Sequence, residues 1–125
     1  MYEITVKKTF SAAHTLMIGG KSETLHGHNF TVEVTLSSDR LDDEGLVLDF
    51  RILKGWTEEI LKELDHRFLN ELSFFKGINP TSENIARFIY ERIAEKIQSQ
   101  SYSLQKVAVG ESESAKAVYR RSING

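Results

Sequence analysis

Two stretches in the first third of the chain alternate between apolar and polar residues. The first covers residues 2–10, with small residues continuing it through 11–14, and the second covers residues 28–37. A period of two is typical of a β-strand with one buried face. The stretch between them, residues 17–24, contains Gly19-Gly20 and predicts a loop. We therefore expect the two strands to form one long antiparallel pair.

Apolar residues recur at helical spacing in two later stretches. They predict one helix over about residues 51–64 and a second over about 82–98. Asn79-Pro80 stands before the second helix, where proline disfavours helical backbone for the residue ahead of it. Thr81 or Ser82 is then placed to cap that helix.

Residues 104–111 and 115–120 predict a closing β-hairpin. The resulting order, β-β-α-α-β-β, indicates one α+β domain over residues 1–125. We expect a four-stranded antiparallel sheet with both helices on one face. A sheet this short has two open edges, which favour pairing with another subunit, so an oligomer is expected.

Composition excludes several classes of function. Apolar residues make up 40% of the 125 residues and charged residues 27%, and the net charge of −2 gives no strong field for nucleic acid or a membrane surface. The longest apolar runs are far too short to span a bilayer. The chain enters the first strand with no signal peptide and contains no cysteine. We expect a cytoplasmic protein with neither nucleic-acid nor membrane partners.

Three of the four histidines are candidate metal ligands. His26 and His28 are separated by Gly27, so on a strand their imidazoles point to the same face. His14 ends the first strand, and pairing of the two strands would bring all three imidazoles together. Three histidines with a fourth position open is how a catalytic zinc ion (Zn²⁺) is held, and the lack of cysteine excludes a thiolate site. An H-x-H pair alone remains a weak signal.

Three further groups are candidates for chemistry. Glu23 precedes His26 by three residues and is placed to act as a general base at the open face of a metal, although it also fits a solvated loop acid. Asp65-His66 fits an oriented acid/base pair, or a histidine favoured by the dipole at a helix C-terminus. Glu111 fits an acceptor for the N–H groups of a planar heterocycle, or a surface acid at a strand end.

Six short segments, in this order along the chain, contain these candidate residues or lie close to them. They are Phe10-Ser11-Ala12-Ala13-His14, Leu25-His26-Gly27-His28, Asp49-Phe50, Leu64-Asp65-His66, Asn79-Pro80-Thr81-Ser82-Glu83-Asn84 and Val109-Gly110-Glu111. Taken together, they resemble the 6-pyruvoyltetrahydropterin synthase family, which includes the 6-carboxytetrahydropterin synthases of queuosine biosynthesis. The resemblance implies the tunnelling fold, or T-fold. It also implies trimers that close their sheets into one barrel, two trimers stacked into a homohexamer, and active sites between subunits.

The same resemblance implies roles for individual residues, and in particular a zinc-dependent lyase acting on a pterin. Asp65 and His66 would form the acid/base pair, and Glu111 would anchor the pterin ring with Thr81 and Ser82 nearby. The zinc ligands would be His14, His26 and His28.

One departure from the family changes the expected reaction. Members that form the pyruvoyl or carboxy products carry a cysteine four residues before the first histidine of His-Gly-His, where this chain has Ser22. A serine hydroxyl is a far weaker base than a thiolate. Glu23 to His28 instead resembles the E-x-x-H-G-H variant, in which a glutamate takes the cysteine's place. That subgroup converts 7,8-dihydroneopterin triphosphate to 6-hydroxymethyl-7,8-dihydropterin in folate biosynthesis.

The cleavage implied is a retro-aldol reaction between the first and second side-chain carbons. Zinc would bind the second-carbon hydroxyl, Glu23 would take its proton, and His66, oriented by Asp65, would return a proton to the first carbon. Three alternatives stay open: a 6-carboxy- or 6-pyruvoyltetrahydropterin synthase working without the thiol, a non-catalytic pterin-binding module, and a generic zinc hydrolase. The phosphate form of the substrate, any Mg²⁺ bound with it, and its phosphate contacts also stay open.

Overall fold

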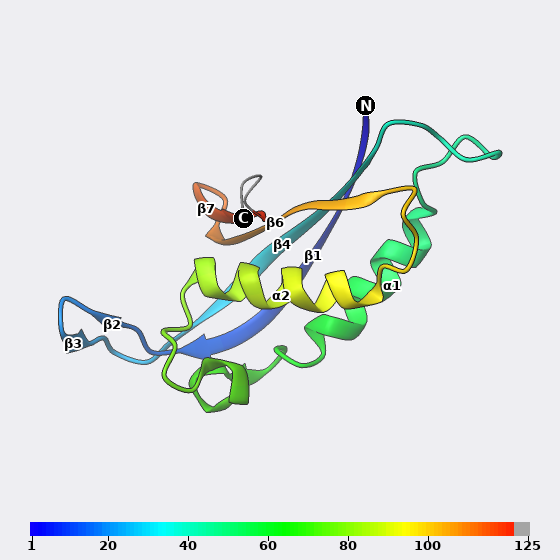
Figure 1. Cartoon of the computed structure of the whole chain (residues 1–125). Helices are drawn as coiled ribbons and strands as arrows, with labels where there is room; N and C mark the ends of the chain where they lie inside the picture. The colour runs from blue at the N-terminus through cyan, green and yellow to red at the C-terminus, as the bar shows by residue number, and fades with distance from the viewer. Residues whose placement is uncertain (122–125) are drawn as a thin grey trace.

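Two long strands form the centre of the sheet in the computed structural model, which describes residues 1–121 (Figure 1). Strand β1 (Tyr2–His14) pairs antiparallel with β4 (His26–Ser38) over the full length of both. The predicted pair is therefore confirmed, and β4 begins two residues earlier than expected. Its first residue is His26, which lies opposite His14, the last residue of β1.

Within residues 1–121 the sheet has five strands in the order β5-β1-β4-β6-β7, rather than the four that we expected. The closing hairpin is confirmed as β6 (Ser103–Ser112) and β7 (Ala115–Tyr119), with β6 antiparallel to β4. The additional strand, β5 (Arg67–Phe68), runs parallel to β1 along two residues only. A strand of two residues is too short to show a period in the sequence, which is why the pattern did not predict it.

Both helices lie on one face of the sheet, as predicted (Figure 1). Helix α1 (Phe50–Leu61) is capped by Asp49, whose carboxylate accepts a hydrogen bond from the Arg51 backbone N–H at 2.8 Å. Helix α2 (Ser82–Lys96) is capped by Thr81, which accepts from the backbone N–H of Asn84 at 3.2 Å. The capping role predicted for Thr81 is confirmed, and both helices end two or three residues earlier than predicted.

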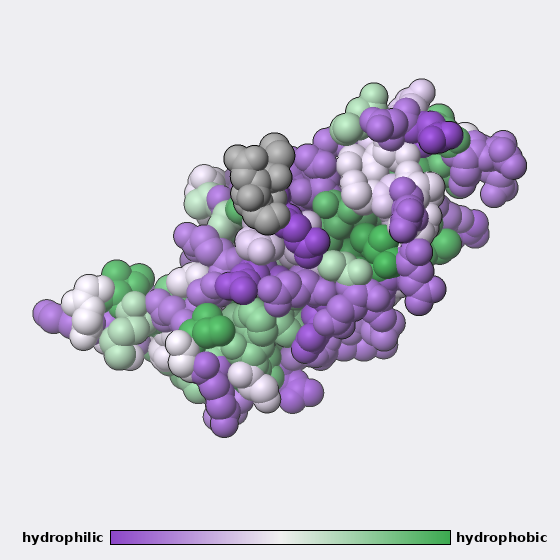
Figure 2. Space-filling model, in the orientation of Figure 1, coloured by the Kyte–Doolittle hydropathy of each residue, from purple (hydrophilic) through white to green (hydrophobic). Residues whose placement is uncertain are grey.

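The segment between β1 and β4 is a small hairpin rather than the loop predicted for residues 17–24. It consists of β2 (Met17–Ile18) and β3 (Lys21–Ser22), which pair antiparallel around Gly19 and Gly20. Both glycines have positive φ, 61° and 77°, as a two-residue turn of type I′ requires. Figure 2 shows apolar residues reaching the surface at this end of the molecule, where Met17 and Ile18 are more than half exposed.

The core lies between the helices and the sheet face that carries the histidines. Phe10 of β1 and Phe30 of β4 stack with ring centroids 5.0 Å apart, and both are buried. Two short 3-10 helices, η1 (Leu69–Glu71) and η2 (Ser73–Phe75), close the end of the core between β5 and α2. No helix among residues 1–121 is long and apolar enough to cross a membrane.

Candidate active site

The three candidate metal ligands converge at one end of the β1–β4 pair. The strand register places His14 opposite His26 and Ala12 opposite His28, so all three imidazoles lie on the face that also carries Phe30. One ring nitrogen from each lies within 4.8 Å of the others. The convergence expected from strand pairing is therefore observed. The Phe30 ring, with its centroid 5.4 Å from that of His14 and 5.5 Å from that of His28, gives the cluster an apolar floor.

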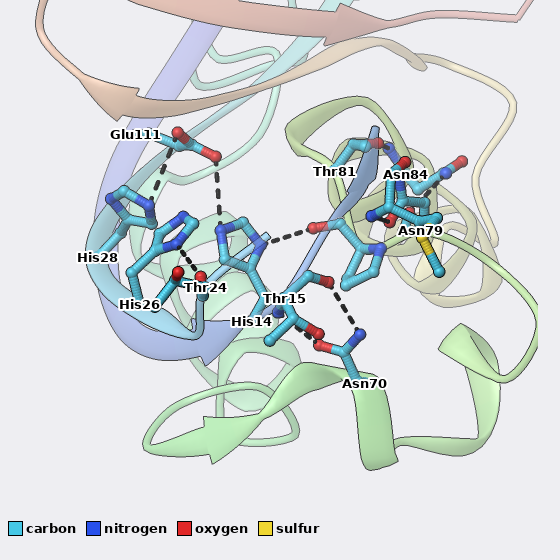
Figure 3. A network of polar contacts seen from close by, with 12 residues as sticks. His14, Thr15, Thr24, His26, His28, Asn70, Asn79, Thr81, Asn84 and Glu111 are labelled. Carbon is cyan, nitrogen blue, oxygen red and sulfur yellow. Dashed lines mark hydrogen bonds and ion pairs between the residues drawn. The ribbon is translucent and has the colours of Figure 1, made fainter. Parts of the chain in front are cut away.

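Backbone carbonyls orient two of these imidazoles (Figure 3). Nδ1 of His14 donates to the carbonyl of Pro80, and Nδ1 of His26 donates to the carbonyl of Thr24, both at 2.8 Å. Because a carbonyl only accepts, these contacts put the proton on Nδ1 and leave the Nε2 lone pair free. Burial lowers the pKa of His14, which favours the neutral ring that binds a metal.

The unpartnered nitrogens show that the cluster fits a metal ion. Nε2 of His14 and Nε2 of His28 are buried without a hydrogen-bond partner within residues 1–121. Buried polar atoms are normally paired, so two orphaned nitrogens aimed at one point indicate a ligand that supplies the missing contact. Three neutral imidazoles with an open side are the donor set of a catalytic zinc site. The residues present therefore fit Zn²⁺.

Glu111 lies beside this cluster, which the sequence did not predict. Its Oε1 is 3.7 Å from Nε2 of His14, and its Oε2 is 3.7 Å from Nε2 of His28 (Figure 3). The β6–β7 register shifts between Gly110 and Ser112, so Glu111 sits at an irregularity of the kind that re-aims a side chain. Gly110 permits it, because a Cβ there would lie 2.9 Å from the carbonyl oxygen of Ala115.

The three residues expected to bind the pterin share one pocket. Glu111, Thr81 and Ser82 line a cavity of about 380 Å³, within the range of small-molecule sites. The wall also contains apolar residues from the β1–β2 connection and from β7. The other lining residues are Leu16, Ile18, Glu83, Ala115, Lys116 and Ala117. The structure thus brings this predicted group together, and it joins the histidine cluster through Glu111.

Asp65 and His66 form a contact, but they lie beyond the helix rather than at its end. Helix α1 ends at Leu61, so a histidine stabilised by the dipole at the helix terminus is not what the structure shows. His66 has φ of 59°, and its Nδ1 lies 3.0 Å from Oδ2 of Asp65. Oδ1 of Asp65 accepts from the Ser11 backbone N–H at 2.9 Å, the main reason that the Asp65 pKa is lowered.

The imidazole of His66 does not share the Glu111 pocket. Its side chain is 81% exposed and lines a separate cavity of about 520 Å³, whose wall also includes Ser11, Gly27 and the candidate metal ligand His28. Ser11 and Gly27 alternate with the metal-facing positions of β1 and β4, whereas His28 occupies one of those positions, so the cavity borders the histidine cluster without containing Glu111. One chain therefore presents the predicted acid/base pair and the predicted ring-binding residues in different pockets.

A backbone hydrogen bond holds Glu23 in position, whereas its carboxylate has no partner among residues 1–121. It follows β3, and its backbone N–H donates to the carbonyl of Leu16 at 2.7 Å. Among residues 1–121 its carboxylate makes no hydrogen bond or ion pair, and the residue is exposed. The structure thus brings Glu23 near the start of β4 without joining its side chain to the histidines.

Two asparagines that sequence reasoning missed hold the chain that follows His14. The side-chain amide of Asn70 makes two 2.9 Å hydrogen bonds with the backbone N–H and carbonyl of Thr15. Asn79 does the same with Met17, also at 2.9 Å, and Asn84 supports it by donating to its carbonyl at 2.8 Å. We call these contacts the asparagine bridges. Their only signal in the sequence is the presence of Asn79 and Asn84 in a segment matching the family.

A sequence profile described as 6-pyruvoyl tetrahydropterin synthase matches residues 3–122. The chain belongs to this family. A 6-carboxy-5,6,7,8-tetrahydropterin synthase from Synechocystis is 39% identical over 101 residues, covering 76% of this chain and 77% of that protein. A dihydroneopterin monophosphate aldolase from Pyrococcus furiosus is 43% identical over 90 residues, covering 72% and 73%.

Solved structures of family members show the same fold. A structure of the Plasmodium vivax 6-pyruvoyltetrahydropterin synthase superposes with a TM-score of 0.80 and 26% identity, covering 98% of each chain. That structure is of a catalytic-residue mutant in which glutamate is replaced by alanine, and a companion structure replaces glutamate by cysteine. The α+β tunnelling fold is confirmed, and the family relationship makes this chain a relative of pterin side-chain lyases.

Proposed function

We propose that this protein is a zinc-dependent aldolase that cleaves the side chain of phosphorylated 7,8-dihydroneopterin and releases 6-hydroxymethyl-7,8-dihydropterin for folate biosynthesis. The observation that carries the proposal is the absence of cysteine in a chain that keeps the three histidines, the Asp65–His66 pair and Glu111. A reaction that needs a thiolate is disfavoured, whereas a retro-aldol cleavage needs only a general base. Glu23 stands next to Ser22, the position of the missing cysteine, and is the candidate for that base.

One relative supports the cleavage reaction, and another supports a catalytic glutamate. The Pyrococcus furiosus protein is named for an aldolase reaction on dihydroneopterin monophosphate. The Plasmodium vivax enzyme has a glutamate among its catalytic residues. The triphosphate is the substrate that the E-x-x-H-G-H resemblance implies, and the Pyrococcus relative adds the monophosphate as a second candidate. Both are retro-aldol substrates because the phosphate lies beyond the bond that breaks.

The metal would be held by His14, His26 and His28 through their Nε2 atoms. A zinc ion bound there supplies a Lewis acid that polarises a hydroxyl on the substrate side chain. The hydrogen bonds from Nδ1 of His14 and of His26 fix the ring orientation before any ion binds. The apolar floor of Phe30 keeps water from the inner side of the cluster.

The residues of the chain would divide the remaining work. The Glu111 carboxylate accepts hydrogen bonds from the ring N–H groups, and Thr81 and Ser82 line the same cavity. Glu23 takes the proton of the second-carbon hydroxyl, which becomes the aldehyde oxygen as the carbon–carbon bond breaks. The electron pair passes into the pterin ring, and His66 returns a proton to the first carbon.

The arrangement of the pockets favours an active site shared between copies of the chain. His66 and Glu111 line different cavities within one chain, and a neighbouring copy would bring its own acid/base pair to the ring-binding pocket. The sheet offers edges for such contacts, because β5 covers only Ala12 and Ala13 of β1. We propose the homohexamer, a dimer of trimers, that the resemblance implies.

A product assay tests the reaction. Zinc-loaded protein is incubated separately with 7,8-dihydroneopterin triphosphate and monophosphate, and the pterins are identified by mass. We expect 6-hydroxymethyl-7,8-dihydropterin together with a phosphorylated two-carbon aldehyde. Glu23→Gln should lower kcat by at least about 100-fold, the contribution of a general base, with zinc content unchanged. Glu44→Gln serves as the matched control, because it removes the charge of another exposed glutamate, in the turn between β4 and α1.

Other products would reject the aldolase. A pyruvoyl product or 6-carboxytetrahydropterin would mean that another group has replaced the thiol, as the similarity to the Synechocystis synthase suggests. Tight pterin binding without turnover would make the protein a binding module. Full activity of Glu23→Gln with zinc bound would remove Glu23 from the mechanism.

A further inference from the structure

The carboxylate of Glu111 faces two unpartnered nitrogens without hydrogen bonding to either. Both O···N separations are 3.7 Å, beyond the range of a hydrogen bond. Nε2 of His14 and Nε2 of His28 are nevertheless buried and lack any other partner in the described chain. The carboxylate and the two imidazoles therefore surround a space that none of the three side chains fills.

The separations are close to those between the ligands of one metal ion. In a tetrahedral zinc site with bonds of about 2.0–2.1 Å, neighbouring ligand atoms lie roughly 3.3 Å apart. A shift of a few tenths of an ångström would give the Glu111 oxygens that spacing to the two nitrogens. Carboxylate oxygen is itself a normal zinc ligand, with bonds of about 2.0–2.2 Å. Three histidines leave one position open, and Glu111 lies on that side of His14 and His28.

We propose that Glu111 is the fourth ligand of the metal in the pterin-free protein and leaves the metal when the substrate enters. This inference rests on the proposed function in one respect, namely that Glu111 binds the pterin ring once the substrate is in place. The substrate hydroxyl needs the position that Glu111 holds, so the two compete for it. Without substrate, Glu111 would fill the fourth ligand position. When substrate binds, the N–H groups of the pterin ring would hydrogen bond to the Glu111 carboxylate, and the substrate hydroxyl would take its place on the metal.

The surroundings of Glu111 allow two positions for its carboxylate. The side chain is 36% exposed and extends from the irregular end of β6 into the cavity shared with Thr81 and Ser82. Within residues 1–121 its only charged or polar contacts are the two histidines. Among these described residues, no other hydrogen bond or ion pair holds the carboxylate on the metal side or on the ring side.

Metal affinity of the pterin-free protein is the first test. Zinc affinity is measured by competition with a chelator for the wild type, Glu111→Gln and Glu83→Gln. Glu83 lines the same cavity, so its variant removes the same charge from the same pocket. We expect Glu111→Gln to bind zinc at least about 10-fold more weakly and Glu83→Gln to match the wild type. Equal affinities for all three proteins would overturn the inference.

Access to the open position is the second test. The Co²⁺-substituted proteins are titrated with thiocyanate, which changes the visible spectrum when it binds the metal. In Glu111→Gln the change should occur at about 10-fold lower thiocyanate than in the wild type or Glu83→Gln. Neopterin, added to the wild type, should shift its spectrum by releasing Glu111. Equal thiocyanate responses in the three proteins would show that Glu111 does not occupy the position.

The two proposals fail in different ways. A wild-type protein that binds no stoichiometric zinc would contradict the zinc-dependent aldolase. A wild-type protein that binds zinc and forms 6-hydroxymethyl-7,8-dihydropterin, while Glu111→Gln keeps its metal affinity and thiocyanate response, would contradict only the role of Glu111 as a ligand.

Discussion

His14 and Pro80 are 66 residues apart in the sequence and are joined by a 2.8 Å hydrogen bond from the imidazole Nδ1 to the backbone carbonyl. The bond ties the metal-facing end of β1 to the segment that leads into α2. It also fixes which nitrogen of His14 is available as a ligand. The fold therefore prepares the site before a metal arrives, and metal binding should in turn stabilise the fold.

Removing the metal should lower thermal stability. Zinc at a free concentration of about 1,000 times its dissociation constant should add about 4 kcal/mol to the free energy of unfolding. Calorimetry with and without a chelator measures the difference. His28→Ala, which removes a ligand whose side chain is one-quarter exposed, should abolish most of this zinc-dependent shift. An unchanged shift in His28→Ala would show that zinc binds elsewhere.

Gly110→Ala should destabilise the protein because its Cβ would lie 2.9 Å from the Ala115 carbonyl oxygen and 3.1 Å from that of Ser112. We expect a loss of about 1–3 kcal/mol in the free energy of unfolding, measured in urea. Gly55→Ala is the matched control, since a Cβ there, in α1, would meet no described atom within 4 Å apart from the neighbouring backbone of the helix itself. The control should be stabilised by up to about 1 kcal/mol. Similar losses in both variants would contradict a special requirement at Gly110.

Asn79→Ala should loosen the β2–β3 hairpin by removing both hydrogen bonds to Met17. The expected loss is about 1–2 kcal/mol, from two net hydrogen bonds at a partly exposed site. Limited proteolysis should cut residues 17–22 faster than in the wild type, and kcat should fall because Glu23 follows this hairpin. Asn79→Asp keeps the acceptor but sets a carboxylate oxygen against the Met17 carbonyl oxygen, so it should also weaken the hairpin. Unchanged cleavage in Asn79→Ala would rule out this positioning role.

The contribution of Asp65 should depend on pH. The Ser11 backbone N–H holds the pKa of Asp65 below its ordinary value of 3.8, with a smaller contribution from His66. A carboxyl whose pKa is lower in the folded state stabilises the protein above the unfolded pKa and loses that effect as pH falls through the folded value. The urea midpoint of the wild type should therefore exceed that of Asp65→Asn at pH 7, and the gap should narrow at pH 3. A gap that is independent of pH would contradict the shift.

The regular parts of the fold were predictable because they are long enough to show a period. The alternation of residues 2–10 corresponds to strand β1, and the helical spacing after residue 82 corresponds to helix α2. The convergence of the three histidines also followed from strand parity. The elements that the pattern did not predict are too short to show a period. Strand β5 has two residues, and the hairpin at Gly19-Gly20 has strands of two residues each.

The position of Glu111 beside the histidines was not predictable from the sequence. It depends on the register of three strands and on an irregularity after Gly110 that no periodic pattern reveals. The asparagine bridges are similar, because side-chain amides that pair with a distant backbone leave no trace in hydrophobic spacing.

His66 is the only residue other than glycine with positive φ within residues 1–121. For a side chain with a Cβ this conformation costs about 1 kcal/mol or more, and glycine adopts it freely. Selection for folding stability alone would therefore favour glycine at this position. The 81% exposed imidazole at this position is the one proposed above to return a proton to the substrate. We expect His66→Gly to raise the free energy of unfolding measured in urea and to lower kcat in the product assay. Full activity of this variant would contradict the proposed role of the imidazole.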